Sequence, residues 1–166
     1  LNNDIKPIIG MEVKTNQDNF ILIAKNNNGY RNLIKIATII SDREITFDDL
    51  KIYSKDIILI IPYSSYNEKI TNFFDEYYIG YTSVEERDKV KDKGVLITDI
   101  SYIEKNDYKY LDYLLMIKDD KKLGEMELNT YTGKHLLDKE EFNNLTNDIV
   151  RSNMKYICDE CKVTFE

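Results

Sequence analysis

The chain has 166 residues, of which 42% are hydrophobic and 32% are charged, and its net charge is −7. This composition is typical of one globular domain that is large enough to bury a substantial core. The negative charge argues against a surface that grips nucleic acid directly, because phosphate-binding surfaces carry an excess of Lys and Arg. No apolar run approaches the roughly 20 residues of a membrane-spanning helix, and the first residues lack the pattern of a secretory signal. We therefore expect a single domain, residues 1–166, in the cytoplasm and without membrane contact.

The first part of the chain predicts two strands followed by a helix. Residues 8–13 form a short apolar run that contains one carboxylate, Glu12, in what reads as a buried strand. Residues 20–24 show no polar alternation, which is typical of a strand covered on both faces. A helix follows with Asn27 or Asn28 as its cap. Its expected apolar stripe consists of Tyr30, Leu33, Ile34, Ala37 and Ile40.

The rest of the chain predicts an alternation of helices and strands. Thr46 and Ser83 are expected to cap two of the helices, and Gly94 is expected to end the second of them. Residues 119–132 show neither helical nor strand periodicity and predict an irregular, exposed loop. Strands that alternate with helices at this pace indicate an α/β fold with mostly parallel strands. The expected strands are residues 57–61, 77–81, 95–101 and 161–165, and the other expected helices are residues 67–76, about 106–118, 138–145 and 147–160.

Two segments carry a resemblance to a known family. KPIIGMEV (residues 6–13) and LIAKNNNGYRNLIK (residues 22–35) resemble the PHP (polymerase and histidinol phosphatase) domain. The resemblance is to the form found at the front of bacterial C-family replicative DNA polymerases, the DNA polymerase III alpha subunits. Further segments follow in the family's order, including ITFDDLKIYS (residues 45–54) and NDIVRSNMKYICDECKVTF (residues 147–165).

The resemblance implies a distorted TIM-like barrel of βα units. The family's opening strands, which bear a His-x-His pair and an Asp-His pair, have no counterpart in this sequence. We therefore expect an incomplete PHP-type barrel, that is, a fragment from the later part of the domain without its first βα units. Missing strands leave unpaired sheet edges, so the chain is expected to self-associate or to form an open sheet.

The resemblance also implies where a metal site would lie. Active PHP domains gather several His, Asp and Glu side chains at the C-terminal mouth of the barrel, because metals that activate water need imidazole and carboxylate ligands. Glu12 matches one ligand position and Asp99 matches another, whereas Asn19 and Ser101 stand near positions that carry imidazoles in active relatives. The chain contains one His in all. We therefore expect a degenerate site with Glu12 and Asp99 as vestigial metal ligands and with no catalytic residue.

Each candidate residue also has a structural interpretation. Glu12 can be held by a hydrogen bond or a salt bridge to a neighbouring strand, and Asp99 can cap the loop that follows it. His135 precedes a helix and is expected on the surface. Cys158 and Cys161 are expected to be small buried hydrophobes, because a structural zinc site needs a second pair of ligands and a thioredoxin-like motif lies at a helix start.

The resemblance implies that the parent protein is a DNA-directed DNA polymerase, a nucleotidyltransferase of bacterial replication that uses Mg²⁺ held by aspartates of a palm domain. The chain itself is expected to need no cofactor and to act as a scaffold for the remainder of the polymerase chain. A proofreading exonuclease or another replisome subunit is a further expected partner. Two rivals stay open: a stand-alone metal-dependent phosphoesterase of the same superfamily, and an α/β interaction domain unrelated to polymerases.

Overall fold

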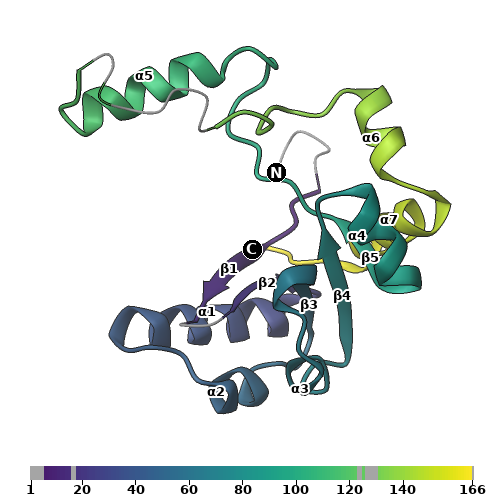
Figure 1. Cartoon of the computed structure of the whole chain (residues 1–166). Helices are drawn as coiled ribbons and strands as arrows, with labels where there is room; N and C mark the ends of the chain where they lie inside the picture. The colour runs from purple at the N-terminus through teal and green to yellow at the C-terminus, as the bar shows by residue number, and fades with distance from the viewer. Residues whose placement is uncertain (1–5, 16–17, 123–124, 126–130, 166) are drawn as a thin grey trace. The chain divides into compact units, whose positions relative to one another are not determined.

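The computed structural model describes residues 6–15, 18–122, 125 and 131–165 (Figure 1). The chain divides into two compact units. The first unit consists of Leu1–Ile97 and Leu145–Glu166, and the second consists of Thr98–Asn144. The assignment of the whole chain to a single domain stays a prediction.

The first unit is built on a five-stranded sheet with the strand order β1-β2-β3-β4-β5. The pairs β1–β2 and β2–β3 are antiparallel, whereas β3–β4 and β4–β5 are parallel. The predicted α/β fold is therefore confirmed, with its parallel strands in the later half of the sheet. In the described part of the chain β1 and β5 are the two edges, which matches the expected open sheet. The strands are β1 (Gly10–Lys14), β2 (Asn19–Ala24), β3 (Ile57–Pro62), β4 (Glu76–Tyr81) and β5 (Gly94–Leu96).

Helices follow the strands along the chain. None of the described helices is long and apolar enough to cross a membrane. The second unit contains α5 (Tyr108–Lys118) and all of α6 (Lys139–Leu145) except Leu145. The helices of the first unit are α1 (Asn27–Asp42), α2 (Phe47–Ile52), α3 (Glu68–Thr71), α4 (Val84–Val90) and α7 (Asp148–Glu160), with short 3-10 turns at Tyr63–Ser65 and Lys91–Lys93.

Both faces of the sheet are covered, which explains why β3 is apolar along its whole length. Ile57, Leu59 and Ile61 point to one face, where they pack with residues of β1, β2, α1 and α2. Ile58 and Ile60 point to the other face, because successive side chains of a strand alternate. There they pack with Tyr78 and Val95 from the sheet and with Ile157 from α7. The sheet is thus a rigid layer between two helical layers.

Helix α1 is capped one residue earlier than predicted and buries only part of its predicted stripe. The side chain of Asn26 accepts hydrogen bonds from the backbone N–H groups of residues 28 and 29, so Asn26 is the cap rather than Asn27 or Asn28. Leu33 and Ile36 are buried, whereas Ile34, Ala37 and Ile40 of the predicted stripe are exposed. The prediction is confirmed for Leu33 and Tyr30, which pack in the core, and was wrong for the other three residues, because α1 carries apolar residues around more of its circumference than the sheet covers.

Other predicted boundaries also differ from the structure. Gly94 begins β5 rather than ending a helix, since α4 stops at Val90 and Lys91 takes a positive φ of 53°. Helix α3 is shorter than predicted, and Glu76 already belongs to β4. Strand β5 ends at Leu96 rather than at residue 101. Residues 161–165 form no strand, and of the predicted loop at 119–132, residues 123–124 and 126–130 lie outside the described residues.

Thr46 starts α2 as predicted, through a reciprocal pair of hydrogen bonds. Its hydroxyl accepts from the backbone N–H of Asp49, and the Asp49 carboxylate accepts from the backbone N–H of Thr46. We expect Thr46→Ala to lower the free energy of unfolding by about 1 kcal/mol, because the first turn loses its cap. Urea unfolding measures the change. Thr38→Ala, on the exposed side of α1, is the matched control and should be neutral; an equal loss in both variants would show that the cap contributes nothing.

Candidate metal centre

Glu12 lies on the edge strand β1, opposite Ile21 of β2. Its side chain is 55% exposed, and its carboxylate lies 3.9 Å from the ammonium of Lys14. The expectation of a buried strand at Glu12 is therefore wrong. Val13 and Met11 point toward the core, whereas Glu12 and Lys14 alternate onto the opposite side of a strand that has no neighbour beyond it among the described residues. A divalent cation at Glu12 would meet a positive charge.

Asp99 lies in the second unit, close before Tyr102. Its carboxylate accepts a hydrogen bond from the ammonium of Lys134, and this bond is the first cause that raises the pKa of Lys134 above its ordinary value. The backbone N–H of Ser101 donates to the carbonyl of Lys134 at 2.8 Å, so the two segments run beside each other. Asp99 is therefore held by a lysine side chain, and a metal ion would have to displace that lysine.

His135 is buried, contrary to the prediction that it lies on the surface. Its Nε2 lies 2.9 Å from Oε2 of Glu141, and its ring stacks on Tyr102 at 6.5 Å between centroids. His135 and Tyr102 also form an isolated parallel bridge. Local sequence patterns could not predict this contact, because 33 positions separate the two residues. Through these contacts, His135 links the segment at Tyr102 to helix α6 within the second unit.

Glu141 is the hydrogen-bond partner of His135, and its protonation at low pH tests whether this contact stabilises the second unit. Hydrogen bonds from Lys105 first and His135 second, then from the backbone of Asp138, lower the pKa of Glu141 from 4.5 to about 2. A carboxyl group with a lowered pKa stabilises the fold above its ordinary pKa and loses that contribution as pH falls through the lowered value.

We expect the amide resonances of α6 to lose dispersion as the pH falls from about 4.5 toward 2, following Glu141. The variant Glu141→Gln should already show the weakened state at neutral pH and should lack this part of the pH dependence. NMR spectra of both proteins across that range provide the measurement. Identical pH profiles for the two proteins would show that Glu141 does not hold α6.

The residues present do not fit a multinuclear metal centre. Among the residues that the structure describes, no three His, Cys, Asp or Glu side chains are grouped so that they could hold a metal ion. Glu12 and Asp99 belong to different units, and each lies beside a lysine. Asn19, opposite Lys14 in the β1–β2 register, offers an amide, and Ser101 offers a hydroxyl where the resemblance implies imidazoles. No step of metal-assisted hydrolysis can be assigned to these side chains.

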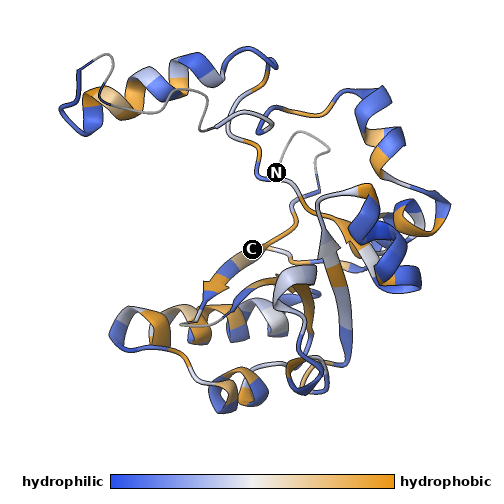
Figure 2. Ribbon diagram, in the orientation of Figure 1, coloured by the Kyte–Doolittle hydropathy of each residue, from blue (hydrophilic) through white to orange (hydrophobic). Residues whose placement is uncertain are grey.

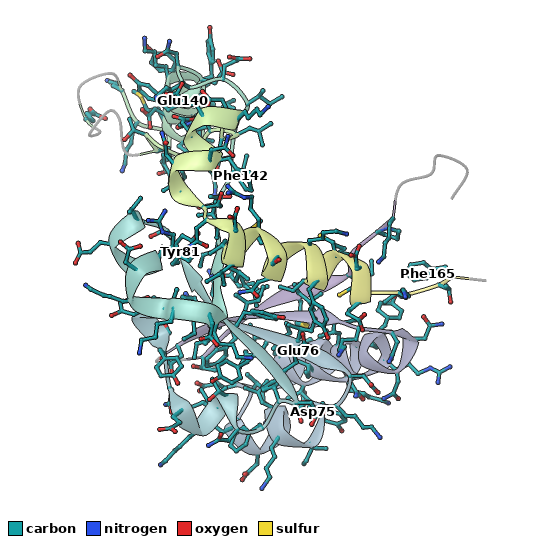
Figure 3. All side chains as sticks on the ribbon, turned by 90° about the vertical axis from the view of Figure 1, so that its right-hand side faces the viewer. Asp75, Glu76, Tyr81, Glu140, Phe142 and Phe165 are labelled. Atoms are coloured by element: carbon teal, nitrogen blue, oxygen red, sulfur yellow. The ribbon has the colours of Figure 1, made fainter. Side chains whose placement is uncertain are left out.

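The first unit also has an open hollow of about 590 Å³ at the amino end of β4. Asp75 and Glu76 mark that end of the strand, opposite Tyr81 at its carboxyl end (Figure 3). Both oxygens of Glu76 are engaged, one by the ammonium of Lys25 at 2.7 Å and the other by the hydroxyl of Tyr78 at 3.1 Å. Barrel enzymes place their chemistry at the carboxyl ends of the strands, so this hollow lies at the wrong end for a hydrolytic centre.

The two cysteines differ in their surroundings. Cys161 is buried, as predicted, and burial raises the pKa of its thiol. Cys158 is exposed, so the prediction that it is buried was wrong, and both thiols are free. Cys158 lies in the last turn of α7. Because burial raises its pKa, Cys161 lacks the low thiol pKa of a reactive cysteine.

Comparisons with known proteins agree with the resemblance. A DNA polymerase III subunit alpha of Streptococcus pyogenes is 31% identical over 130 residues, which are 74% of this chain and 12% of that protein. One of Staphylococcus aureus is 27% identical over 154 residues, 86% of this chain and 14% of that protein. One of Halalkalibacterium halodurans is 39% identical over 70 residues, 36% of this chain and 6% of that protein. The chain thus spans only a small part of the length of these relatives. Residues 1–154 match the family model of the PHP domain, and the chain belongs to that family.

Proposed function

We propose that this chain is the PHP segment of a bacterial replicative DNA polymerase of the DNA polymerase III alpha type, and that it supports catalysis located elsewhere in that protein. The observation that carries the proposal is the lysine beside each candidate metal ligand, Lys14 at Glu12 and Lys134 at Asp99. An ammonium within hydrogen-bonding or ion-pair distance supplies the positive charge that a metal would otherwise supply.

The polymerase setting is supported by the relatives, which are named DNA polymerase III subunit alpha. In such a protein nucleotidyl transfer and its Mg²⁺ ions would belong to aspartates of a separate palm domain. The PHP segment would contact the remainder of the polymerase chain and a proofreading exonuclease or another replisome subunit in the cytoplasm. Its net charge of −7 fits a protein-contacting role better than a direct grip on DNA.

Each of the two units suits a scaffold role because its own packing holds its side chains in place. The sheet of the first unit is packed on both faces, and a close-packed core is stiff rather than fluid. In the second unit, His135 contacts Glu141 through a hydrogen bond and Tyr102 through ring stacking. Rigid elements of this kind hold surface side chains at fixed positions for a partner.

Two assays on the purified chain test the proposal. The first supplies p-nitrophenyl phosphate with Mn²⁺, Zn²⁺ or Mg²⁺, and the second supplies primed DNA, Mg²⁺ and deoxynucleotides. We expect no hydrolysis above the level of the double variant Glu12→Gln/Asp99→Asn, and no primer extension. Metal-dependent hydrolysis that the double variant abolishes would identify a phosphoesterase instead, and primer extension would place polymerase chemistry in this segment.

A further inference from the structure

Helix α5 carries apolar side chains on two different sides. Met116 is buried, and Leu111 and Leu115 are half-buried, so these residues form the inner side. Four large side chains point outward instead, which we call the outer stripe: Tyr110 (67% exposed), Tyr113 (46%), Leu114 (62%) and Ile117 (77%). In Figure 2, α5 carries both hydrophobic (orange) and hydrophilic (blue) positions.

The spacing of the outer stripe is that of a helix-packing surface. Its residues fall at positions i, i+3, i+4 and i+7, which form one continuous line along a helix. A single exposed apolar residue is ordinary, but four in one line form a contiguous patch of the kind that marks an interaction site.

In its described part, the second unit has no hydrophobic cluster that could absorb these side chains. The described part of this unit contributes no residue to the three hydrophobic clusters of the molecule, all of which belong to the first unit. A unit as small as Thr98–Asn144 buries too little apolar surface to be stable without support. A partner on the outer stripe would supply part of that missing burial.

The charges around the outer stripe indicate the chemistry of the partner. At about 100° per residue, Lys109 lies along one side of the stripe and Lys118 along the other. Both lysines are exposed, whereas Asp112, the remaining charged residue of α5, is buried on the opposite side. The stripe therefore has a positive rim in a chain whose net charge is −7. It fits an apolar surface rimmed by Asp and Glu.

A second copy of the chain, an anionic membrane and a nucleic acid are the alternative occupants, and the experiment below distinguishes each of them from a helix of the longer polypeptide.

We propose that the outer stripe of α5 is a docking surface for a helix of the longer polymerase polypeptide, apolar along one side and rimmed by carboxylates. The inference rests on the proposed function, because the relatives extend far beyond the matched segment and so provide the occupant: the match covers 12% of the streptococcal protein. Tyr110, Leu114 and Ile117 would be the anchors, since buried aromatic and aliphatic residues at the centre of an interface carry most of its binding energy.

Overlapping peptides that cover the Streptococcus pyogenes protein outside the matched segment provide the probe. Fluorescence anisotropy measures their binding to the purified chain. We expect an amphipathic, acid-rimmed peptide to bind and Ile117→Glu to weaken it at least about tenfold. The double variant Lys109→Glu/Lys118→Glu should weaken it too and should reduce its dependence on salt. Ile52→Glu in the first unit is the matched control, because Ile52 is 68% exposed and should not affect binding.

Several outcomes would overturn the proposal. They are the absence of any binding peptide, binding that survives Ile117→Glu, and binding that Ile52→Glu weakens equally. A dimer in sedimentation that Ile117→Glu dissociates would assign the stripe to a second copy of the chain. Binding to anionic vesicles or to single-stranded DNA that Ile117→Glu abolishes would assign it to a membrane or a nucleic acid. None of these results changes the hydrolysis and extension assays, so the docking surface and the proposed function fail separately.

Discussion

Gly29→Ala is expected to lower the free energy of unfolding by about 3 kcal/mol, because the added methyl group has no room. A β-carbon at Gly29 would lie 2.0 Å from the carbonyl oxygen of Asp56 and 3.4 Å from the α-carbon of Ala24. Both neighbours are backbone atoms, so no side chain can rotate away. The first turn of α1 and the turn before β3 would have to separate, and with them the bond from the Asn28 amide to the Asp56 carboxylate.

Urea or thermal unfolding measures this change, and Gly133→Ala serves as its control. A β-carbon at Gly133 meets nothing within 4 Å, but its φ of 80° strains any residue other than glycine. That strain costs about 1 kcal/mol. A loss at Gly29 no greater than the loss at Gly133 would mean that α1 does not approach Asp56 as closely as the structure has it.

Lys25→Met is expected to lower the free energy of unfolding by about 2 kcal/mol, because it leaves the Glu76 carboxylate without its cation. The two side chains are only 28% and 14% exposed, and their charged atoms lie 2.7 Å apart. The bond to Glu76 is also the first cause that raises the pKa of Lys25. After the substitution, the hydroxyl of Tyr78 would be the partner that remains for Glu76.

The double variant Lys25→Met/Glu76→Gln separates the charge from the packing. Removing both charges eliminates the unpaired carboxylate, so the double variant should recover more than half of the stability that Lys25→Met loses. Denaturant unfolding of the single and double variants provides the measurement. Equal stability of Lys25→Met and the double variant would show that the pair contributes through its methylene packing alone.

Features set by neighbouring residues could be predicted from the sequence. The start of α2 follows from Thr46 and the acidic residue three positions later, and the buried strand β3 follows from its unbroken apolar run. The parallel pairing of β3, β4 and β5 follows from the helices between them. These features depend on a few adjacent side chains and on backbone preferences, which the sequence displays directly.

Features set by distant contacts could not be predicted. Gly29 looked like a weak helix position, yet its lack of a side chain is what admits the Asp56 carbonyl. His135 looked like a surface residue because Tyr102, which covers it, comes much earlier in the chain. The exposed side of α5 depends on what the second unit leaves uncovered. Such positions follow from tertiary packing, which overrides local patterns.

The candidate site was predictable in part. Its two residues, Glu12 and Asp99, came from the resemblance, and Lys14 could have been found from strand alternation, because residues i and i+2 share a face. Lys134 could not have been found in this way, since it lies 35 positions from Asp99. The lysine partners are the part of the site that the structure adds, and they argue for a scaffold rather than a hydrolase.

Metal analysis of the purified chain tests this interpretation most directly. The chain is dialysed against Mn²⁺ or Zn²⁺, freed of excess metal, and its metal content is measured by mass spectrometry beside that of Glu12→Gln/Asp99→Asn. We expect both proteins to retain the same background level, because Lys14 and Lys134 place a positive charge beside each of the two carboxylates. Tightly bound metal in the native chain that disappears in the double variant would contradict the scaffold role and indicate a working metal centre.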